Sequence, residues 1–415
     1  MTDKSSSPGP ALPSLAATFA VQTVAAMAMF SVAVVAPVAA PDIGVDATLI
    51  GTFTGIAYAS GLGIGLLTGA LADRFGAIRI SQMTMGFALL GCLLLTLSTP
   101  LAAFTSAVAL GLCYGPVNPA STHILARVTP ERSRPLYFSI KQTGMPAGAA
   151  LAGLLLPLIV AAYDWRIAMI ATGLAAAVVA ILIQPLRKPL DAIRRPNQAI
   201  RIGNFLRPLS LVWRTPMLRS LGLMGFFYSG IQVSIMTFYV VYLTAGLSLS
   251  YTEDHVGFGV LGLSLSLPTV GFLYAVLQIS AVFGRLFWGA IGDRLVSARY
   301  LLVGIGLGTA GFSILAGLMS DDLSIFAMAF VSFLLGVTSS GWNGLFFSEL
   351  VKYAPKDRTG DAAAGLQFAT LLGVAVLPAG FGFLVVATGS YFVAFAAAGA
   401  AVGIGAIQFG WSLRR

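Results

Sequence analysis

Long apolar segments recur along the whole chain, with short polar segments between them. A membrane-spanning helix needs about 20 mostly apolar residues. Twelve segments reach that length, at residues 15–36, 48–71, 78–98, 101–125, 135–161, 166–185, 217–245, 268–290, 299–319, 322–349, 360–387 and 391–412. Because they lack the alternation of apolar and polar residues that marks barrel strands, the pattern predicts helices. We therefore expect an all-α membrane protein with twelve transmembrane helices.

The two halves of the chain carry matching residues in the same order. Gly69-Ala-Leu-Ala-Asp73-Arg74 returns 220 residues later as Gly289-Ala-Ile-Gly-Asp293-Arg294. Three further pairs match at a separation of 225, namely Asn118 with Asn343, Pro130 with Pro355, and Gln142 with Gln367. This order predicts a duplicated six-helix unit, and hence two pseudo-symmetric six-helix bundles.

A stretch rich in Arg and Pro, residues 186–216, divides six predicted spans from six. It predicts a linker with short interfacial helices rather than a folded domain. The expected organisation is a cytoplasmic tail at residues 1–14, an N-terminal bundle at 15–185, the linker at 186–216 and a C-terminal bundle at 217–415.

The charges are few and unevenly placed. Only 9% of the residues are charged, against about 25% in soluble proteins. Of the 24 Lys and Arg, 21 fall on one side of the predicted spans when the N-terminus is placed inside. This bias predicts cytoplasmic termini and a place in the bacterial inner membrane. The net charge of +9 is then a topology signal, with affinity for anionic lipid heads as a by-product, and does not indicate nucleic-acid binding.

Residue types that carry catalysis or metal binding are sparse. Cys92 and Cys113 lie in apolar spans, where we expect two buried free thiols rather than a disulfide. His123 and His255 lack metal-ligand spacing to another ligand residue, and the sequence has no phosphate-binding loop. We expect no cofactor, no metal site and no enzymatic activity, and we expect a monomer.

The repeated motif resembles the signature between spans 2 and 3 of the major facilitator superfamily, and the resemblance covers the chain from about residue 14 onward. Span 5 is similar to a second family segment in Gly144-Met-Pro146-Ala-Gly148. The resemblance implies that Asp73 and Asp293, each followed by an arginine (Arg74 and Arg294), contact the opposite half when the cytoplasmic side is closed. One family feature is missing, because Ala107 stands where many proton-driven members carry an arginine in span 4.

The residues of the motif also suit a gating role by themselves. A carboxylate at this position is expected to accept hydrogen bonds from the free N–H groups of a neighbouring helix start. Gly69 and Gly289 are expected to let helices approach closely. A simple turn with a solvated charge pair is the alternative.

Two cations, Lys141 and Arg285, lie inside predicted spans 5 and 8. Neither has an acidic residue three or four positions away, and charges inside a membrane need partners. In the resembled fold these spans face each other, so a substrate carboxylate would balance both charges. Gly284-Arg285-Leu-Phe-Trp-Gly289 also resembles span 8 of oxalate/formate antiporters and monocarboxylate transporters, where the arginine contacts the substrate. Alternatively, Lys141 extends to the cytoplasm, and Arg285 bonds helix-end carbonyls or Glu349.

Uncharged side chains complete the candidate substrate site: Tyr114, Asn118, Gln142, Gln232, Trp342, Asn343 and Gln367. Each amide has interhelical hydrogen bonding as its alternative role. Together the residues favour a secondary transporter that moves a small organic anion, in particular a monocarboxylate, by alternating access, with a coupling proton or counter-substrate left open. An exporter of lipophilic or drug-like compounds, a transporter of a neutral solute and a non-transporting receptor on the same fold are the alternatives.

Overall fold

The computed structural model describes residues 11–130, 133–192, 194–195, 206–246, 267–320, 322–355 and 358–412, and every regular element in these ranges is helical. The α-helices are α1 (Ala11–Ile43), α2 (Ile50–Phe75), α3 (Ala77–Leu95), α4 (Pro100–Val128), α5 (Arg134–Gln142), α6 (Gly144–Ala162), α7 (Trp165–Leu182), α8 (Arg187–Leu190), α9 (Leu206–Arg214), α10 (Pro216–Val241), α11 (Leu267–Arg294), α12 (Ala298–Gly317), α13 (Ile325–Ser339), α14 (Asn343–Tyr353), α15 (Thr359–Thr388) and α16 (Tyr391–Ser412). Short 3-10 turns occupy Ala47–Leu49 and Gln184–Leu186, and a π-helical turn occupies Tyr242–Gly246.

Twelve helical segments in the described ranges are long and apolar enough to cross a membrane, which confirms the predicted number of spans. Spans 5 and 10 are each interrupted within the span. In span 5, Thr143 separates α5 from α6, and in span 10 residues 340–342 separate α13 from α14. Both breaks lie beside glycine, at Gly144 and Gly341, and glycine has a low helix propensity.

Contacts divide the described helices into two compact units. Unit 1 comprises Met1–Met29, Ser60–Ala149 and Arg166–Ile202, and unit 2 comprises Phe30–Ala59, Ala150–Trp165 and Gly203–Arg415. The division falls inside α1, α2 and α6, so each of these helices contributes to both units. The bundle boundaries expected from the sequence stay a prediction.

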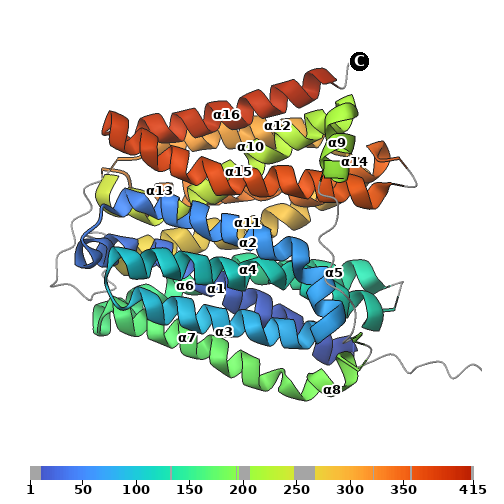
Figure 1. The fold of residues 1–415 in the computed structure, drawn as a ribbon. Coiled ribbons are helices and arrows are strands. Elements are labelled where there is room, and N and C mark those ends of the chain that lie inside the picture. The colour runs from blue at the N-terminus through green and yellow to red at the C-terminus, as the bar shows by residue number, and fades with distance from the viewer. Residues whose placement is uncertain are drawn as a thin grey trace, which may run out of the picture. The chain divides into compact units, whose positions relative to one another are not determined.

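In unit 1, α3 packs between α4 and α7 (Figure 1). The Ser106 hydroxyl of α4 donates to the Gly91 carbonyl of α3, with 2.7 Å between the oxygens. On the other face of α3, a Cβ added to Gly173 of α7 would lie 3.3 Å from the Cys92 Cβ. Cys92 and Cys113 are both buried and free, as expected from the apolar spans around them.

In unit 2, α10 is buried over nearly its whole length and packs on α15 and α16 (Figure 1). The Ser229 hydroxyl of α10 donates to the Thr370 carbonyl of α15 at 2.7 Å. The C-terminal part of α6 crosses α11 so closely that a Cβ on Gly271 would lie 2.1 Å from the Gly153 carbonyl oxygen. Small residues at such crossings allow the backbones of membrane helices to touch.

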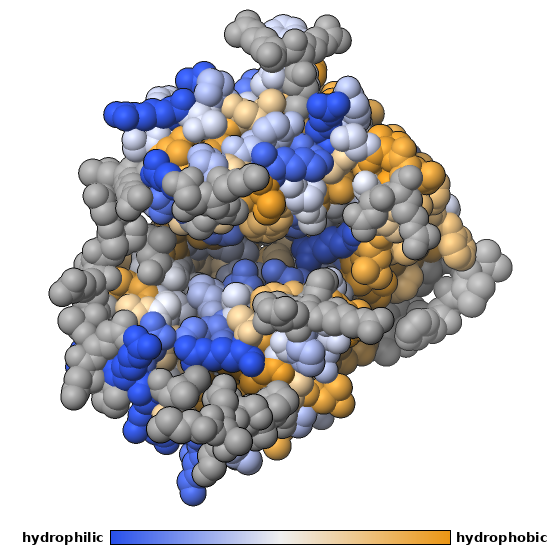
Figure 2. All heavy atoms as spheres, turned by 90° about the vertical axis from the view of Figure 1, so that its right-hand side faces the viewer, coloured by the Kyte–Doolittle hydropathy of each residue, from blue (hydrophilic) through white to orange (hydrophobic). Residues whose placement is uncertain are grey.

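Two short helices, α8 and α9, lie within the predicted linker. In unit 2, α9 packs on α15, where a Cβ on Gly365 would lie 2.6 Å from the Pro208 carbonyl oxygen. Trp213 of α9 is 66% exposed. Within unit 1, α5 and α8 lie at the end that faces the viewer in Figure 2, and hydrophilic side chains are visible on this face. This face is the predicted cytoplasmic end.

Candidate functional site

Lys141 is a fully buried cation in unit 1. It lies in the last turn of α5, has no exposed side-chain area, and its Nζ donates to the side-chain oxygen of Asn118 on α4. Lys141 belongs to none of the ion pairs found among the described residues. The alternative in which the lysine extends to the water boundary therefore does not fit the structure. An ammonium is costly to keep charged in such a position when its partner is a neutral amide.

The glycines that follow Lys141 hold α6 against α1 within unit 1. A Cβ on Gly144 would lie 3.0 Å from the Gln22 Cβ, and a Cβ on Gly148 would lie 2.0 Å from the Thr23 carbonyl oxygen. Gln22 is 4% exposed, and its side-chain oxygen has no hydrogen-bond partner among the described residues. This close packing sets the position at which the chain turns from α5 into α6, and so the position of Lys141.

In unit 2, two predicted site residues meet at the break in span 10. The Arg285 Nε of α11 lies 3.3 Å from the Ser340 carbonyl oxygen, and the Asn343 Nδ2 lies 3.4 Å from the same oxygen. Both contacts are longer than an average hydrogen bond. Arg285 thus contacts a helix-end carbonyl, which is one of the two alternatives to its expected role in substrate binding. Interrupted membrane helices expose backbone groups of this kind at the substrate sites of transporters.

Trp342, at the end of this break, is joined to two residues of α10. Its indole N–H donates to the Gln232 side-chain oxygen at 3.0 Å. The Tyr228 ring packs edge-on against the indole, with 5.8 Å between ring centroids and 88° between the planes. Trp342 and Gln232 are 3% and 5% exposed. The hydrogen bond and the ring contact together hold the unwound turn against α10.

The predicted substrate residues fall into both units. Unit 1 holds Tyr114, Asn118, Lys141 and Gln142, whereas unit 2 holds Gln232, Arg285, Trp342, Asn343 and Gln367. Asn118, Gln142 and Gln367 are exposed on their helices, and Tyr114 is half-buried. The structure thus brings together Lys141 with Asn118, Gln232 with Trp342, and Arg285 with Asn343.

At the repeated motif, Asp73 has side-chain partners that the sequence did not predict. Its Oδ1 lies 3.0 Å from His123 Nε2 and 3.8 Å from Arg127 Nη2, both on α4. The Asp73 carbonyl accepts the backbone N–H of Arg195 at 2.6 Å. Among the described residues, the Asp73 carboxylate contacts side chains of α4, so the expected hydrogen bonds from a neighbouring helix start stay a prediction. The arginine beside it, Arg74, lies 5.4 Å over the Phe75 ring.

The carboxylate that does cap a helix start is that of Asp191, just after α8. Its two oxygens accept the backbone N–H groups of Ile78 and Arg79, in the first turn of α3, at 3.0 and 3.1 Å. Burial raises the pKa of the Asp191 carboxyl above its ordinary value, while the two N–H donors and the guanidinium groups of Arg187 and Arg194 act in the opposite direction. Asp191 is 5% exposed, so this cap is a buried contact that joins the linker to α3.

Among the described residues, nothing packs closely on the motif glycines, so the close helix approach expected there stays a prediction. A Cβ added to Gly69 or to Gly289 would meet no heavy atom of the described residues within 4 Å. Gly76, two positions after the motif, is the glycine that packs tightly, because a Cβ there would lie 2.2 Å from the Asp191 Cγ. The side chains of Asp293 and Arg294, at the end of α11, lie outside the described residues.

Two signals in the sequence point to the residues that were missed. His123 and Arg127 are four positions apart, so they share one face at the end of α4. Asp191 is the single acidic residue in the basic stretch 186–216. Neither observation shows which residue is contacted. Asp191, for example, lies 113 positions from its partner Ile78 along the chain.

Comparisons with known proteins agree with this architecture. The model of the Major Facilitator Superfamily matches residues 18–364. A gallate transporter of Pseudomonas putida is 25% identical over 81% of this chain and 79% of its own length. The 4-hydroxybenzoate transporter PcaK of Acinetobacter baylyi is 29% identical over 36% of this chain and 33% of its own length.

Solved structures show the same fold at low sequence identity. A crystal structure of the nucleoside transporter NupG has a TM-score of 0.74 at 13% identity and covers 97% of this chain and 99% of that one. An inward-facing bacterial homologue of the human lysosomal transporter Spinster has a TM-score of 0.73 at 15% identity, with 97% of each chain covered. At this level of identity the likeness concerns the fold alone.

Proposed function

The chain belongs to the Major Facilitator Superfamily, and on that basis we propose that it transports the anion of a small organic acid, with an aromatic monocarboxylate as the first candidate. Membership makes the protein an integral membrane transporter with twelve spans rather than an enzyme. Secondary active transport by alternating access, in a bacterial inner membrane with both termini in the cytoplasm, belongs to the proposal.

Lys141 is the observation that carries the anionic substrate class. An ammonium with no exposed area, held by a neutral amide, is costly to keep charged inside a membrane. A carboxylate that arrives at this position offsets the cost by Coulomb attraction in surroundings of low dielectric constant. A neutral substrate would leave the cost in place.

Arg285 and Asn343 give independent support from unit 2. Both side chains are only partly buried and converge on the Ser340 carbonyl where span 10 is unwound. A guanidinium presents several N–H donors in a planar fork that suits a carboxylate.

The aromatic ring in the proposal comes from the relatives. Gallate and 4-hydroxybenzoate, named for the two transporters similar to this chain, are both benzoate derivatives that carry one carboxylate and at least one hydroxyl. Both compounds are monocarboxylates, the class expected from the sequence. Their aromatic ring adds apolar surface for binding.

Pairs of ligands with the same ring and different charge test the proposal directly. We expect purified protein in detergent to bind 4-hydroxybenzoate at least about tenfold more tightly than 4-hydroxybenzamide, a difference of about 1.4 kcal/mol. The Lys141→Gln variant keeps a hydrogen-bonding side chain without the charge, so it should bind the acid and the amide about equally. Calorimetry on both ligands measures the effect.

Lys188→Gln is the matched control, because it makes the same change at an exposed lysine. It should keep the preference for the acid. If the wild-type protein binds the acid and the amide with equal affinity across benzoate, 4-hydroxybenzoate and gallate, the substrate is not an aromatic anion, and a neutral solute becomes the better hypothesis.

A further inference from the structure

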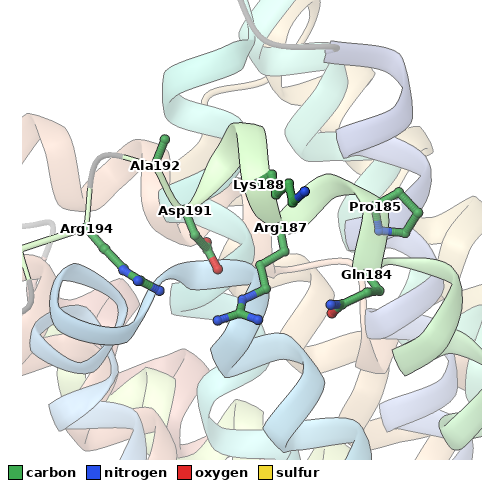
Figure 3. A pocket seen from close by; sticks show the side chains of 7 residues that line it. All are labelled: Gln184, Pro185, Arg187, Lys188, Asp191, Ala192 and Arg194. Atoms are coloured by element: carbon green, nitrogen blue, oxygen red, sulfur yellow. The ribbon is translucent and has the colours of Figure 1, made fainter.

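An open pocket of about 560 Å³ lies at the end of span 6, where α7 passes into α8 (Figure 3). Its charged and polar lining comes from Gln184, Arg187, Lys188, Asp191 and Arg194. All five residues belong to unit 1. In Figure 3 the guanidinium groups of Arg187 and Arg194 lie on either side of the Asp191 carboxylate.

The pocket carries more positive charge than its single carboxylate can balance. Three cations face one acid, and both oxygens of Asp191 already accept N–H groups from the start of α3. Two arginines and a lysine in one concave site are the groups that proteins use for phosphate, arginine by parallel hydrogen bonds and lysine as a point charge.

An apolar surface adjoins this basic pocket. Ile181 and Leu182, at the end of α7 and two to three positions before Gln184, are 72% and 69% exposed. They belong to a segment that is long and apolar enough to span a membrane, where acyl chains are the expected surroundings. A ligand that fills the pocket from this side has a phosphate head and an apolar tail.

We propose that this pocket binds the phosphate of an anionic phospholipid, with Arg187, Lys188 and Arg194 as its ligands and Ile181 and Leu182 against the acyl chains. The proposal assigns a defined lipid site to one helix end, beyond the general attraction of basic loops for anionic membranes. It is independent of the proposed substrate.

The position of the pocket connects it to the repeated motif. Asp191 caps α3, which begins directly after the motif, and the backbone N–H of Arg195 donates to the Asp73 carbonyl. A phosphate held by Arg187 and Arg194 therefore sits on the same short segment that contacts the motif at Asp73 and the start of α3 at Ile78 and Arg79. Lipid occupancy should stabilise the arrangement of that segment.

Lipid titration followed by native mass spectrometry tests the site. The full-length protein in detergent is titrated with phosphatidylglycerol and, in parallel, with phosphatidylcholine of the same chain length. We expect the wild type to retain phosphatidylglycerol preferentially. Each basic residue near a charged membrane surface contributes about 1 kcal/mol, so Arg187→Gln with Arg194→Gln should weaken this binding about 10- to 30-fold.

The matched control removes two other basic residues, by Arg214→Gln with Arg219→Gln, at the ends of α9 and α10 outside the pocket. It should leave the affinity for phosphatidylglycerol within about twofold of the wild type. If both double variants lose the same affinity for phosphatidylglycerol, the lipid is attracted by the basic surface in general, and the proposed site is overturned. Displacement of the lipid by an equal concentration of glycerol phosphate would assign the pocket to a soluble phosphate and overturn the lipid proposal.

Arg187 lies near the buried Asp191, so the double variant must be shown to unfold at the wild-type temperature. If it does not fold, Lys188→Gln replaces it, because Lys188 is exposed. This single variant should bind phosphatidylglycerol about fivefold more weakly. Wild-type affinity in Lys188→Gln would then count against the site.

Discussion

At the scale of single residues, Gly76 lies just after the repeated motif and has no room for a side chain, whereas Gly69 within the motif has open space. The φ of +97° at Gly76 is a conformation that L side chains rarely adopt. A Cβ at this position would also lie 2.3 Å from an oxygen of the buried Asp191 carboxylate. Replacement by alanine therefore strains the backbone and displaces the cap of α3 at the same time.

We expect Gly76→Ala to lower the stability of the folded protein by about 2–4 kcal/mol, because strain at a positive φ and the loss of a buried cap add together. Thermal unfolding of the purified variant measures this. Gly69→Ala is the control, since Gly69 has open space around it and alanine favours a helix by about 1 kcal/mol. Equal melting temperatures for the two variants would contradict the contact between Gly76 and Asp191.

At this scale the sequence points to individual residues of interest, but it does not show which side chains they contact. Asp73 stands out because an acid between two apolar spans is unusual, yet its contacts with His123 and Arg127 depend on how α2 and α4 pack. The burial of Lys141 was left open for the same reason, because a lysine side chain is long enough to reach the water boundary from its position. Hydrophobic pattern gives the depth of a residue and not the direction of its side chain.

At the scale of elements, the two halves of the duplication differ in one respect. In span 4, α4 continues as a helix through Gly115, Pro116 and Asn118. In the matching stretch of span 10, the helix stops at Ser339 and restarts at Asn343. The apolar runs predicted both spans correctly. They could not predict the break, because Ser340-Gly341-Trp342 is apolar enough to continue a span, and its conformation depends on Trp288 and Gln232 from other helices.

Gly341→Ala should disturb the break in span 10. A Cβ there would lie 2.2 Å from the Trp288 Cδ1 and 2.8 Å from the Val337 carbonyl oxygen, which accepts the Trp288 indole N–H at 3.0 Å. Overpacking of this kind costs about 1–3 kcal/mol. We expect a lower unfolding temperature and a shift in tryptophan emission. Gly344→Ala, three positions on in open space, should change neither property, and a matching loss in both variants would point to a general weakness of α14 instead.

At the scale of the whole molecule, the distribution of charge determines which way the chain crosses the membrane. Cysteines introduced singly at Asp322, in the loop between α12 and α13, and at Arg195, after α8, should respond differently to a thiol reagent that cannot cross membranes. In intact cells we expect labelling at position 322 and none at position 195, because the positive-inside bias predicts that Arg195 lies in the cytoplasm. Inverted membrane vesicles should give the opposite result, and labelling of position 195 in cells would reverse the topology.

The two native thiols lie where reagents do not reach, since Cys92 is 0% and Cys113 is 1% exposed. We therefore expect the wild-type protein not to react with thiol reagents, so no native cysteine has to be removed before a probe is attached. One added cysteine on each compact unit, carrying a pair of spin labels or fluorophores, would form a molecular ruler. Its readings in the presence and absence of a ligand would follow, in the otherwise unaltered protein, the motion by which a carrier works.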